Sequence, residues 1–390
     1  MPCLRNRQGI GDATVIHETG ATQMKIEQIQ AIPYRIPFTK ALKFASGEIT
    51  HADHVLVRIQ TSDGVIGFAD APPRPYTYGE TQESIVSVIR NIFAPELIGL
   101  SLLDRERVAA VLHRTVHNYA AKGAIDIALW DALGKTLNVS VSALLGGHAD
   151  SMRVSHMLGF GEPGAVLDEA LDIRERYGIT AFKIKVGRQP ARDDLDVCRR
   201  LAAELSEDIE LYVDANRGWS ANQAIDALPT LLESRISLFE EPCDARETMG
   251  RRRLVALSSI PIVGDESVPH PGDVSRELLS SGCSAISIKT ARGGFSNAQA
   301  ILQLCTGLGV DVVMGNQIDT QVGTAATIAF GAAFAAASRR PGELSNYLDL
   351  ADDLIAEPLQ IAAGSMRVPP GPGVGIAIDD DKLAQYREDR

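Results

Sequence analysis

From residue 152 onward the chain alternates short apolar runs with amphipathic helical segments at a nearly constant spacing. The runs lie at residues 153–158, 181–186, 210–215, 236–241, 261–266, 285–290 and 311–316, and a shorter one lies at 342–346. A strand followed by a helix, repeated this often, forms a parallel sheet. Seven or eight such units in about 190 residues are typical of a closed β/α barrel. The repeat therefore predicts an α/β barrel over residues 151–346.

The residues before this repeat have a different pattern. Strands are expected at 25–36 and 53–70, the second one folded back on itself at a hairpin turn over 61–64. Helices are expected at 80–99, 103–116 and 119–137, and residues 37–52 contain turn formers and are expected to be a loop. Strands followed by helices indicate an α+β domain. The chain is thus divided into a flexible extension at 1–23, an α+β domain at 24–150, the barrel at 151–346, and a segment at 347–390 that packs back on the first domain.

The charge balance restricts the kinds of partner. The chain has 38 Lys and Arg against 50 Asp and Glu, a net charge of −12. Nucleic acids and anionic membranes favour basic surfaces, so neither is expected as a partner. No run of 18 apolar residues predicts a transmembrane helix. Five widely spaced cysteines, an odd number, favour a reducing cytoplasm over a disulfide framework.

Charged residues recur near the carboxyl ends of five consecutive predicted strands. They are Lys185, Asp214, Glu240, Asp265 and Lys289, separated by 29, 26, 25 and 24 positions. Each interval equals one strand and helix, so the five side chains are expected around one cavity. The carboxyl ends of barrel strands form the face where barrel enzymes place their active sites. This regularity is difficult to explain by helix capping or by solvated surface residues.

Alternation along each strand predicts which side chains point into the barrel. Lys183 and Lys185 lie opposite an apolar face and should point inward, as should Asp214 with Asn216, and Lys289. The pattern does not decide between neighbouring acids on two strands. Either residue of the pair 240–241, and either residue of the pair 265–266, could face the cavity.

The residue types indicate the chemistry of the cavity. Three carboxylates that converge repel one another unless a cation lies among them, and oxygen ligands without His or Cys favour Mg²⁺ or Mn²⁺. A lysine close to such a cation and to a second lysine should have a lowered pKa and could serve as a general acid or base. The set is suited to moving a proton at the carbon next to a carboxylate, with the metal holding the enolate. A catalytically silent metal-binding barrel is the alternative, but buried charges without a function would cost stability.

For several other polar residues the sequence leaves more than one role open. Glu241, Glu266 and Asp319 could support the site or be structural. Residues 37–54, which include Lys40 and His54, are expected to fold over the barrel mouth as a lid and to contact the end of the substrate distant from the metal. Such loop residues are more often surface residues than ligands.

Several sequence motifs resemble those of a known family. They are FKIKVG (182–187), VDAN (213–216), FEEP (239–242), GDES (264–267), SIKTARGG (287–294) and, in the first domain, AIDIALWDALGK (124–135). In order and spacing they resemble the muconate lactonizing enzyme subgroup of the enolase superfamily. The resemblance implies an α+β capping domain over a modified (β/α)₇β barrel. It implies that Asp214, Glu240 and Asp265 bind one divalent ion, that Lys185 and Lys289 are the acid/base pair, and that Lys183 assists electrostatically.

The resemblance also narrows the reaction. The seventh strand lacks the histidine of the mandelate racemase subgroup, and three stretches (154–160, 314–326 and 342–350) are most similar to bacterial cis,cis-muconate cycloisomerases. The implied reaction forms muconolactone through a metal-stabilised enolate that a lysine protonates. Muconate or chloromuconate, syn or anti ring closure, and the identity of the donor lysine stay open. The rival is racemisation or epimerisation of dipeptides, N-acylamino acids or proline derivatives by the same lysines.

The same resemblance suggests residues that contact the substrate, and an assembly. Candidates for binding or electrostatic roles are Lys183, Asn216, Glu266, Asn316, Asp319 and His54. Two departures affect the pocket: Glu241 replaces a glutamine, and a loop with Asn316 and Asp319 replaces a glutamate-containing loop. The expected ligand is a small carboxylate, and the expected assembly is a cytoplasmic homo-oligomer, with an octamer as the form suggested by the family.

Overall fold

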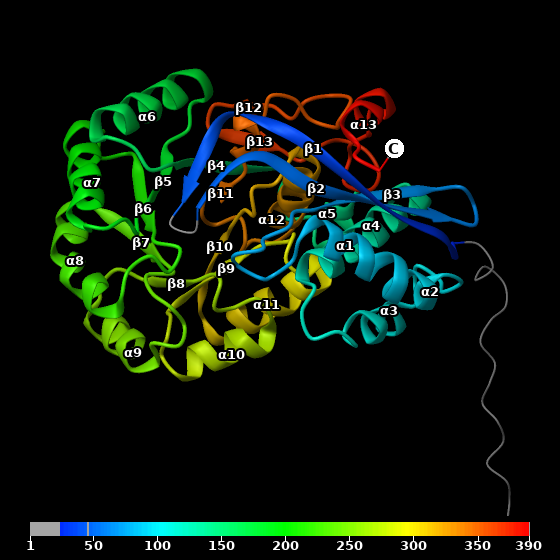
Figure 1. The fold of residues 1–390 in the computed structure, drawn as a ribbon, viewed down its shortest axis with the longest axis horizontal. Coiled ribbons are helices and arrows are strands. Elements are labelled where there is room, and N and C mark those ends of the chain that lie inside the picture. The colour runs from blue at the N-terminus through cyan, green and yellow to red at the C-terminus, as the bar shows by residue number, and fades with distance from the viewer. Residues whose placement is uncertain (1–23, 45–46, 390) are drawn as a thin grey trace, which may run out of the picture.

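The computed structural model describes residues 24–44 and 47–389. The predicted extension at 1–23 lies outside the described residues. Figure 1 shows two units side by side: an antiparallel sheet with helices beside it, and a barrel of strands that helices surround. The long hairpin of the first unit reaches across to the strands of the second (Figure 1).

The antiparallel sheet has the strand order β1-β2-β3. Its strands are β1 (Ile26–Phe44), β2 (Gly47–Thr61) and β3 (Ile66–Ala71). The predicted loop at 37–52 is wrong, because both strands continue through it as a two-stranded ribbon, with Leu42 opposite Ile49. A register shift between Pro37 and Leu42 accommodates the irregular stretch. Since β1 is an edge strand, a proline there removes no hydrogen bond that the sheet needs.

Six helical segments complete the first unit: α1 (Gln82–Val88), the π-helix η1 (Ile89–Phe93), α2 (Ala94–Leu97), α3 (Arg105–Leu112), α4 (Tyr119–Leu137) and α5 (Val141–Leu145). The predicted helix at 80–99 is thus divided by a π-helical turn, while α4 has the predicted bounds. Most of α4 is buried, because it packs between β3 and the barrel helix α11 (Gly294–Leu308). This helix therefore fixes the first unit on the barrel.

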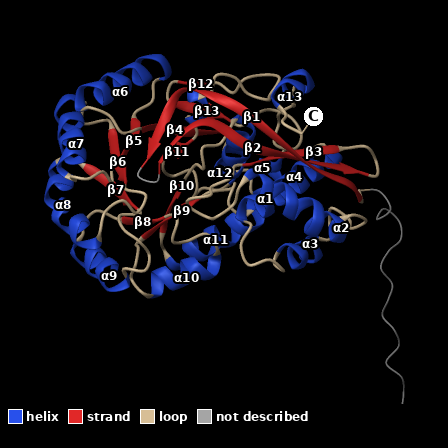
Figure 2. Cartoon of the chain, viewed as in Figure 1, coloured by secondary structure: helices blue, strands red, loops and turns tan. Residues whose placement is uncertain are grey.

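The barrel strands form the parallel path β4 to β10, and β11 pairs in parallel with β4. The strands are β4 (Ser151–Leu158), β5 (Ala181–Lys185), β6 (Glu210–Asp214), β7 (Ile236–Glu240), β8 (Ile262–Gly264), β9 (Ala285–Ile288), β10 (Asp311–Met314) and β11 (Gly342–Glu343). Besides α11, the helices of the barrel are α6 (Pro163–Tyr177), α7 (Arg192–Glu204), α8 (Ala221–Glu233), α9 (Thr248–Leu257), α10 (Pro271–Leu279) and α12 (Gln321–Ala333). Figure 2 shows α6 to α9 as an arc outside β5 to β8. The modified barrel expected from the sequence is confirmed.

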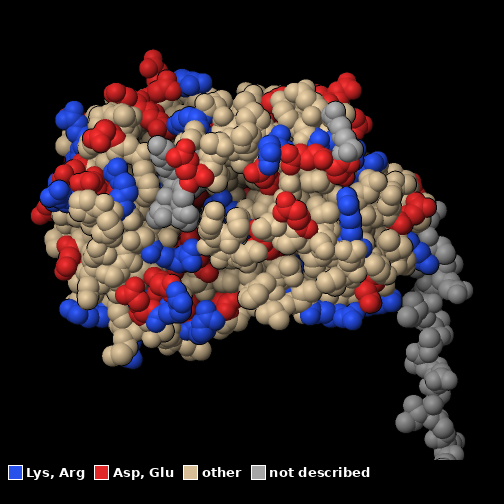
Figure 3. Space-filling view, viewed as in Figure 1, with Lys and Arg blue, Asp and Glu red and all other residues tan. Residues whose placement is uncertain are grey.

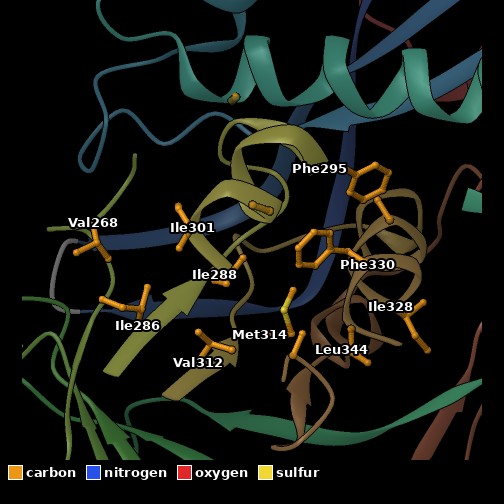
Figure 4. Packing of buried hydrophobic residues seen from close by; sticks show 14 of the residues in the cluster. Val268, Ile286, Ile288, Phe295, Ile301, Val312, Met314, Ile328, Phe330 and Leu344 are labelled. Carbon is orange, nitrogen blue, oxygen red and sulfur yellow. The ribbon is translucent and has the colours of Figure 1, made fainter. Parts of the chain in front are cut away.

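Apolar side chains fill the space between strands and helices. Figure 4 shows Ile286 and Ile288 of β9 on the side that faces α11 and α12. Phe295 and Phe330 stack there with ring centroids 6.1 Å apart. A separate inner cluster contains Tyr212, Leu238, Val263, Ala285 and Val313. The polar ends of the strands therefore stand above a packed apolar plug.

The C-terminal segment contacts both units. It contains η2 (Asn346–Asp349), β12 (Ile361–Ala362), β13 (Ser365–Arg367) and α13 (Asp380–Tyr386). β13 pairs antiparallel with β4 of the barrel. Isolated bridges join Phe38 to Leu350 and Tyr34 to Arg387, and Leu354, Ile355 and Leu383 pack on β1. The segment thus links the barrel to the antiparallel sheet.

The face of the molecule seen in Figure 3 carries charged side chains of both signs. In Figure 3 acidic and basic side chains are interspersed over the visible face. Within residues 24–44 and 47–389, no helix has the length and apolar character needed to cross a membrane.

Candidate active site and metal centre

Strand pairing brings the five predicted charged residues to one end of the barrel. Lys185, Asp214 and Glu240 are the last residues of β5, β6 and β7, and they are neighbours in the parallel register. Asp265 follows β8, and Lys289 follows β9 directly. Because the strands are parallel, sequence intervals of one strand and one helix become adjacent positions on one rim.

The structure also resolves the two pairs that alternation left open. Leu238 and Val263 belong to the inner cluster. Glu240 and Asp265, each two residues further on, therefore share the inner side of their strands. Glu241 points the other way and is held by Arg251 of α9, whose Nη1 donates to its Oε1 at 2.8 Å.

Lysine ammonium groups lie among the inner carboxylates. Lys185 Nζ donates to Asp214 Oδ2 at 2.7 Å, and Lys289 Nζ donates to Asp265 Oδ2 at 2.5 Å. Lys183 Nζ lies 3.0 Å from both Asp214 Oδ2 and Glu240 Oε2. Lys183, Lys185, Asp214, Glu240 and Asp265 are buried, and the Lys289 side chain is 9% exposed. The site is therefore an alternating set of charges that water barely reaches.

The surroundings of the Glu240 carboxylate show whether a metal ion would fit among the three acids. Among the residues that the structure describes, no three His, Cys, Asp or Glu side chains are already close enough together to hold a metal ion. Yet both carboxylate oxygens of Glu240 are buried and accept no hydrogen bond, since Lys183 is at ion-pair distance without a hydrogen-bond angle. A buried carboxylate without donors is costly. Small adjustments of three all-oxygen side chains would let a hard divalent ion satisfy it.

Burial and the neighbouring charges shift the pKa values in this group. Burial raises the pKa of Glu240 well above its ordinary value, and Lys183 only partly opposes this. Burial also acts to raise the pKa of Asp214, but the charges of Lys183 and Lys185 hold it below its ordinary value. Glu240 has one lysine partner, Lys183, whereas Asp214 has two, so the charge of Glu240 is the less compensated.

The predicted fall in lysine pKa assumes a divalent cation beside the lysine, so it stays a prediction. Burial acts to lower the pKa of Lys289, but the charge of Asp265, in direct contact, raises it above its ordinary value. The same balance raises the pKa of Lys183, where Asp214, Glu240 and Glu343 outweigh burial. Without a cation among the carboxylates, the pairing of these two lysines with carboxylates outweighs burial.

Two further predicted residues adjoin this group. Asn216 Oδ1 accepts from Lys185 Nζ at 2.6 Å, and Asn216 Nδ2 donates to Glu266 Oε1 at 3.1 Å. Burial, with the charges of Asp265 and Glu241, raises the pKa of Glu266 to about 7. Asn216 therefore connects Lys185, at the end of β5, with Glu266, which follows β8 three strands away.

Glu241 and Arg251 form a buried pair that supports Asp265 from outside the barrel. Glu241 Oε2 accepts from the Asp265 backbone N at 2.6 Å and from Ser267 Oγ at 2.8 Å. Glu241 is fully buried and Arg251 is 1% exposed. The backbone of Asp265 is therefore fixed through a carboxylate that itself depends on a buried guanidinium.

We expect Glu241→Gln to lower the free energy of unfolding by about 3 kcal/mol, because it leaves the buried Arg251 with only its longer ion-pair contact to Glu277, at 3.4 Å. Urea unfolding of the metal-free protein measures this change. The double variant Glu241→Gln, Arg251→Met should regain part of the loss, since the buried guanidinium is then absent and Glu277 keeps its contact with Arg276. A double variant no more stable than the single one would contradict this role of the pair.

Three residues of the site were missed by the sequence argument. Glu343 on β11 accepts from Lys183 Nζ at 2.7 Å. Arg292 Nη1 donates to Asp265 Oδ1 at 2.9 Å and to the hydroxyl of Tyr78 at 2.8 Å. Glu343 and Arg292 lie inside motifs already quoted, whereas Tyr78 lies in a proline-rich stretch that showed only a break in pattern.

Gly315, after β10, makes room for one of the lysines. A Cβ at this position would lie 2.4 Å from Ser287 Oγ and 2.9 Å from Lys289 Cε. Any larger residue would push the Lys289 side chain aside. The glycine is therefore required by a close approach to the site.

His54 and Asp319 belong to a second buried polar cluster, between β2, β3 and the start of α12. His54 Nδ1 lies 2.8 Å from Asp70 Oδ2, which also accepts from Thr320 Oγ1 at 2.9 Å. Asp319 Oδ1 is buried without a hydrogen-bond partner, and burial, with the charge of Asp70, raises the pKa of Asp319 to about 7. These two predicted residues are therefore tied to the seam between the two units.

Asn316 holds the turn after β10. Its Oδ1 accepts from the backbone N of Asp319 at 2.9 Å and from Asn346 Nδ2 at 2.8 Å, and its Nδ2 donates to the Glu343 carbonyl at 3.1 Å. The side-chain amide of Asn316 therefore makes hydrogen bonds within the protein that fix the position of Asp319.

Comparison with known proteins agrees with this arrangement. Residues 26–146 match the model of the mandelate racemase/muconate lactonizing enzyme N-terminal domain, and residues 165–382 match the enolase C-terminal domain-like model. The chain is 30% identical to muconate cycloisomerase 1-2 of Acinetobacter lwoffii, covering 95% of this chain and 97% of that protein. It is 28% identical to the L-Ala-D/L-Glu epimerase of Bacillus subtilis, covering 90% and 97%.

A solved structure shows greater similarity. The muconate lactonizing enzyme of Mycobacterium smegmatis, in complex with muconolactone, is 55% identical, with a TM-score of 0.93, and the match covers 94% of this chain and all of that one. The family models, which together span most of the chain, describe enzymes that depend on a divalent metal ion. The protein is an enzyme of the isomerase and lyase class and belongs to the mandelate racemase/muconate lactonizing enzyme family of the enolase superfamily.

Proposed function

We propose that this protein converts cis,cis-muconate to muconolactone. The observation that carries the proposal is the 55% identity, over nearly the whole chain, to a lactonizing enzyme solved with muconolactone. The rim of three carboxylates with a lysine on each side supports it, since this chemistry needs one proton donor beside an anion-stabilising centre.

In the proposed reaction one substrate carboxylate attacks a carbon of the conjugated double bonds and closes the lactone ring. The electron pair of that double bond moves toward the other carboxylate, and a lysine ammonium gives a proton to the carbon beside it. Lys185 and Lys289 are the two candidates for the donor. The neutral lysine left behind regains its proton from solvent, so the overall reaction consumes one proton per turnover.

Asp214, Glu240 and Asp265 would hold Mg²⁺ or Mn²⁺, because their donors are all oxygen atoms. When bound, the ion would hold the second substrate carboxylate and stabilise the negative charge that develops on it. Lys183 stays buried between Asp214 and Glu240 and keeps these carboxylates from repelling one another. Burial of the whole group excludes water and strengthens each of these interactions.

A second candidate is epimerisation of a dipeptide or another amino acid derivative. The 28% identity to an L-Ala-D/L-Glu epimerase over most of both chains favours keeping it. In that reaction one lysine would remove the α-proton and the other would return it on the opposite face. Because the same two lysines could serve either reaction, only an assay with each substrate distinguishes the two proposals.

Purified protein, first treated with EDTA and then supplied with Mg²⁺ or Mn²⁺, should be given cis,cis-muconate and, separately, chloromuconates, L-Ala-L-Glu and proline derivatives. We expect loss of muconate ultraviolet absorbance with formation of the lactone. Absence of lactone, together with deuterium exchange at the α-carbon of a dipeptide in D₂O, would replace this proposal with the epimerase.

The ribbon formed by β1 and β2 is proposed to act as the lid. Thr39 Oγ1 donates to the Asp349 carbonyl at 3.0 Å, and Lys40 Nζ lies 2.7 Å from Glu169 Oε1 and 3.5 Å from Asp349 Oδ1. These contacts fasten the ribbon to α6 and η2 across the barrel rim. Polar contacts of Thr39 and Lys40 therefore hold the ribbon, and breaking them would release it from the barrel rim.

Lys40→Ala should raise the KM for muconate a few-fold and leave Mg²⁺ affinity unchanged. Lys40 is about half exposed, so its ion pairs contribute about 1 kcal/mol or less to closure. Arg176→Ala, which removes an exposed ion pair with Asp172 on the same helix α6, is the matched control. If both variants kept the KM of the unmodified enzyme, Lys40 would not fasten a lid.

We also propose a cytoplasmic homo-oligomer. Cys198, Cys243, Cys283 and Cys305 are buried thiols in the described part of the chain, as suits a reducing compartment. Light scattering coupled to gel filtration would give the number of subunits, and a monomer at micromolar concentration would contradict the proposal.

A further inference from the structure

Two hollows meet where the first unit overlies the barrel rim. An enclosed cavity of about 20 Å³ is lined by Tyr78, Asn216, Asp265, Glu266, Lys289 and Gln317. A more open pocket of about 260 Å³ lies toward the β1–β2 ribbon and includes Ala52, His54 and Ile318. Arg74 and Thr77 line both hollows. These two residues therefore form the partition between the catalytic residues and the outer pocket.

The enclosed cavity is too small for a dicarboxylate substrate. A space of about 20 Å³ holds roughly one water molecule. A six-carbon diacid with one end at Asp265 and Lys289 must therefore extend past the partition into the outer pocket. The part of the substrate distant from the metal ligands then lies beside Arg74.

The backbone around Arg74 is fixed before any ligand binds. The Arg74 carbonyl accepts hydrogen bonds from the backbone N of Thr77, Tyr78 and Gly79 at 3.1, 2.8 and 3.2 Å. Prolines on both sides of Arg74 restrict the chain further. The ends of this turn are anchored on the barrel, because the Tyr76 carbonyl accepts from Arg217 Nη2 at 3.4 Å and the Tyr78 hydroxyl accepts from Arg292.

The other basic side chains of the outer pocket are Arg35, His51 and His54, and none of these three lines the catalytic cavity. Arg74 is the cation placed at the boundary with the catalytic cavity. A guanidinium keeps its charge in proteins and binds a carboxylate through two parallel N–H donors.

We propose that Arg74 binds the substrate carboxylate that is not held by the metal ligands, and so makes the enzyme specific for dicarboxylates. This inference rests on the proposed function, in which that carboxylate is the attacking group. A bidentate contact would fix the direction of the attacking oxygen, which is the usual way that a positioned group promotes an internal addition.

The test compares Arg74→Gln and Arg74→Lys with the unmodified Mg²⁺-loaded enzyme. Arg74→Gln should raise the KM for cis,cis-muconate about 10- to 100-fold, the usual effect of losing charge-assisted hydrogen bonds to a carboxylate. Arg74→Lys should keep part of the affinity. Arg107→Gln, which removes an exposed guanidinium from α3 far from either hollow, is the control and should change nothing.

A binding measurement separates recognition from folding. By calorimetry, the unmodified enzyme should bind cis,cis-muconate at least about 10-fold more tightly than its monomethyl ester, and Arg74→Gln should bind both equally. A variant that kept full preference for the diacid would overturn the Arg74 proposal, while lactone formation by the unmodified enzyme would still uphold the proposed function. An unmodified enzyme that neither binds nor converts muconate would overturn both.

Discussion

Glu240→Gln should abolish turnover and weaken Mg²⁺ binding by more than about 100-fold, because a neutral amide is a poor ligand for a hard dication. The metal-free variant should nevertheless be at least as stable as the unmodified protein. Both oxygens of Glu240 are buried without hydrogen-bond donors, so removing the charge relieves a cost instead of creating one. Calorimetry of Mg²⁺ binding and thermal unfolding in EDTA measure the two effects.

Asp214→Asn provides the contrast within the same site. It should also abolish turnover, but it should destabilise the metal-free protein, since Lys183 and Lys185 both depend on this carboxylate. The matched control is Glu207→Gln, at an exposed position before β6, which should alter neither property. Full activity of EDTA-treated enzyme without returned metal would show that these carboxylates do not hold a required ion.

The lysine pair should be asymmetric. If ring closure is an internal addition, only one lysine has to deliver a proton, and its loss should cost on the order of 10²–10⁴ in rate. Loss of the other should cost less. We therefore expect one of Lys185→Ala and Lys289→Ala to be far more damaging to lactone formation than the other, as measured by kcat/KM for muconate.

Both lysine variants should fold, so a difference in their rates reports on catalysis and not on stability. Without Lys185, Asp214 still contacts Lys183, and without Lys289, Asp265 still contacts Arg292. Lys25→Ala, on the outer face near the start of β1, controls for the loss of a lysine. Equal and complete loss in both variants, with deuterium exchange into a single enantiomer of a dipeptide, would instead identify an epimerase.

The sequence by itself determined the barrel and the order of charges on its rim. The intervals of 24 to 29 residues between Lys185, Asp214, Glu240, Asp265 and Lys289 each contain one strand and one helix. Parallel pairing then has only one way to place them, at neighbouring carboxyl ends. The bounds of α4 also followed from the sequence, because its helical apolar pattern is long and uninterrupted.

Local pattern failed where two neighbouring residues have the same character or where turn formers occur within a strand. A period of two cannot choose between Glu240 and Glu241, and only the packing of Leu238 inside the barrel and of Arg251 outside it decides. In the ribbon over residues 37–44 and 47–52, pairing between the two strands overrides the turn preference of Pro37 and Gly47.

Only the tertiary structure revealed partners that are distant in the chain. Glu343 reaches Lys183 across 160 residues, and Tyr78 reaches Arg292 across 214. Arg74 stands at the catalytic cavity because a turn of the first unit is anchored on the barrel. Periodicity describes each strand or helix separately, whereas these contacts depend on how one unit packs on the other, and no spacing in the sequence records that packing.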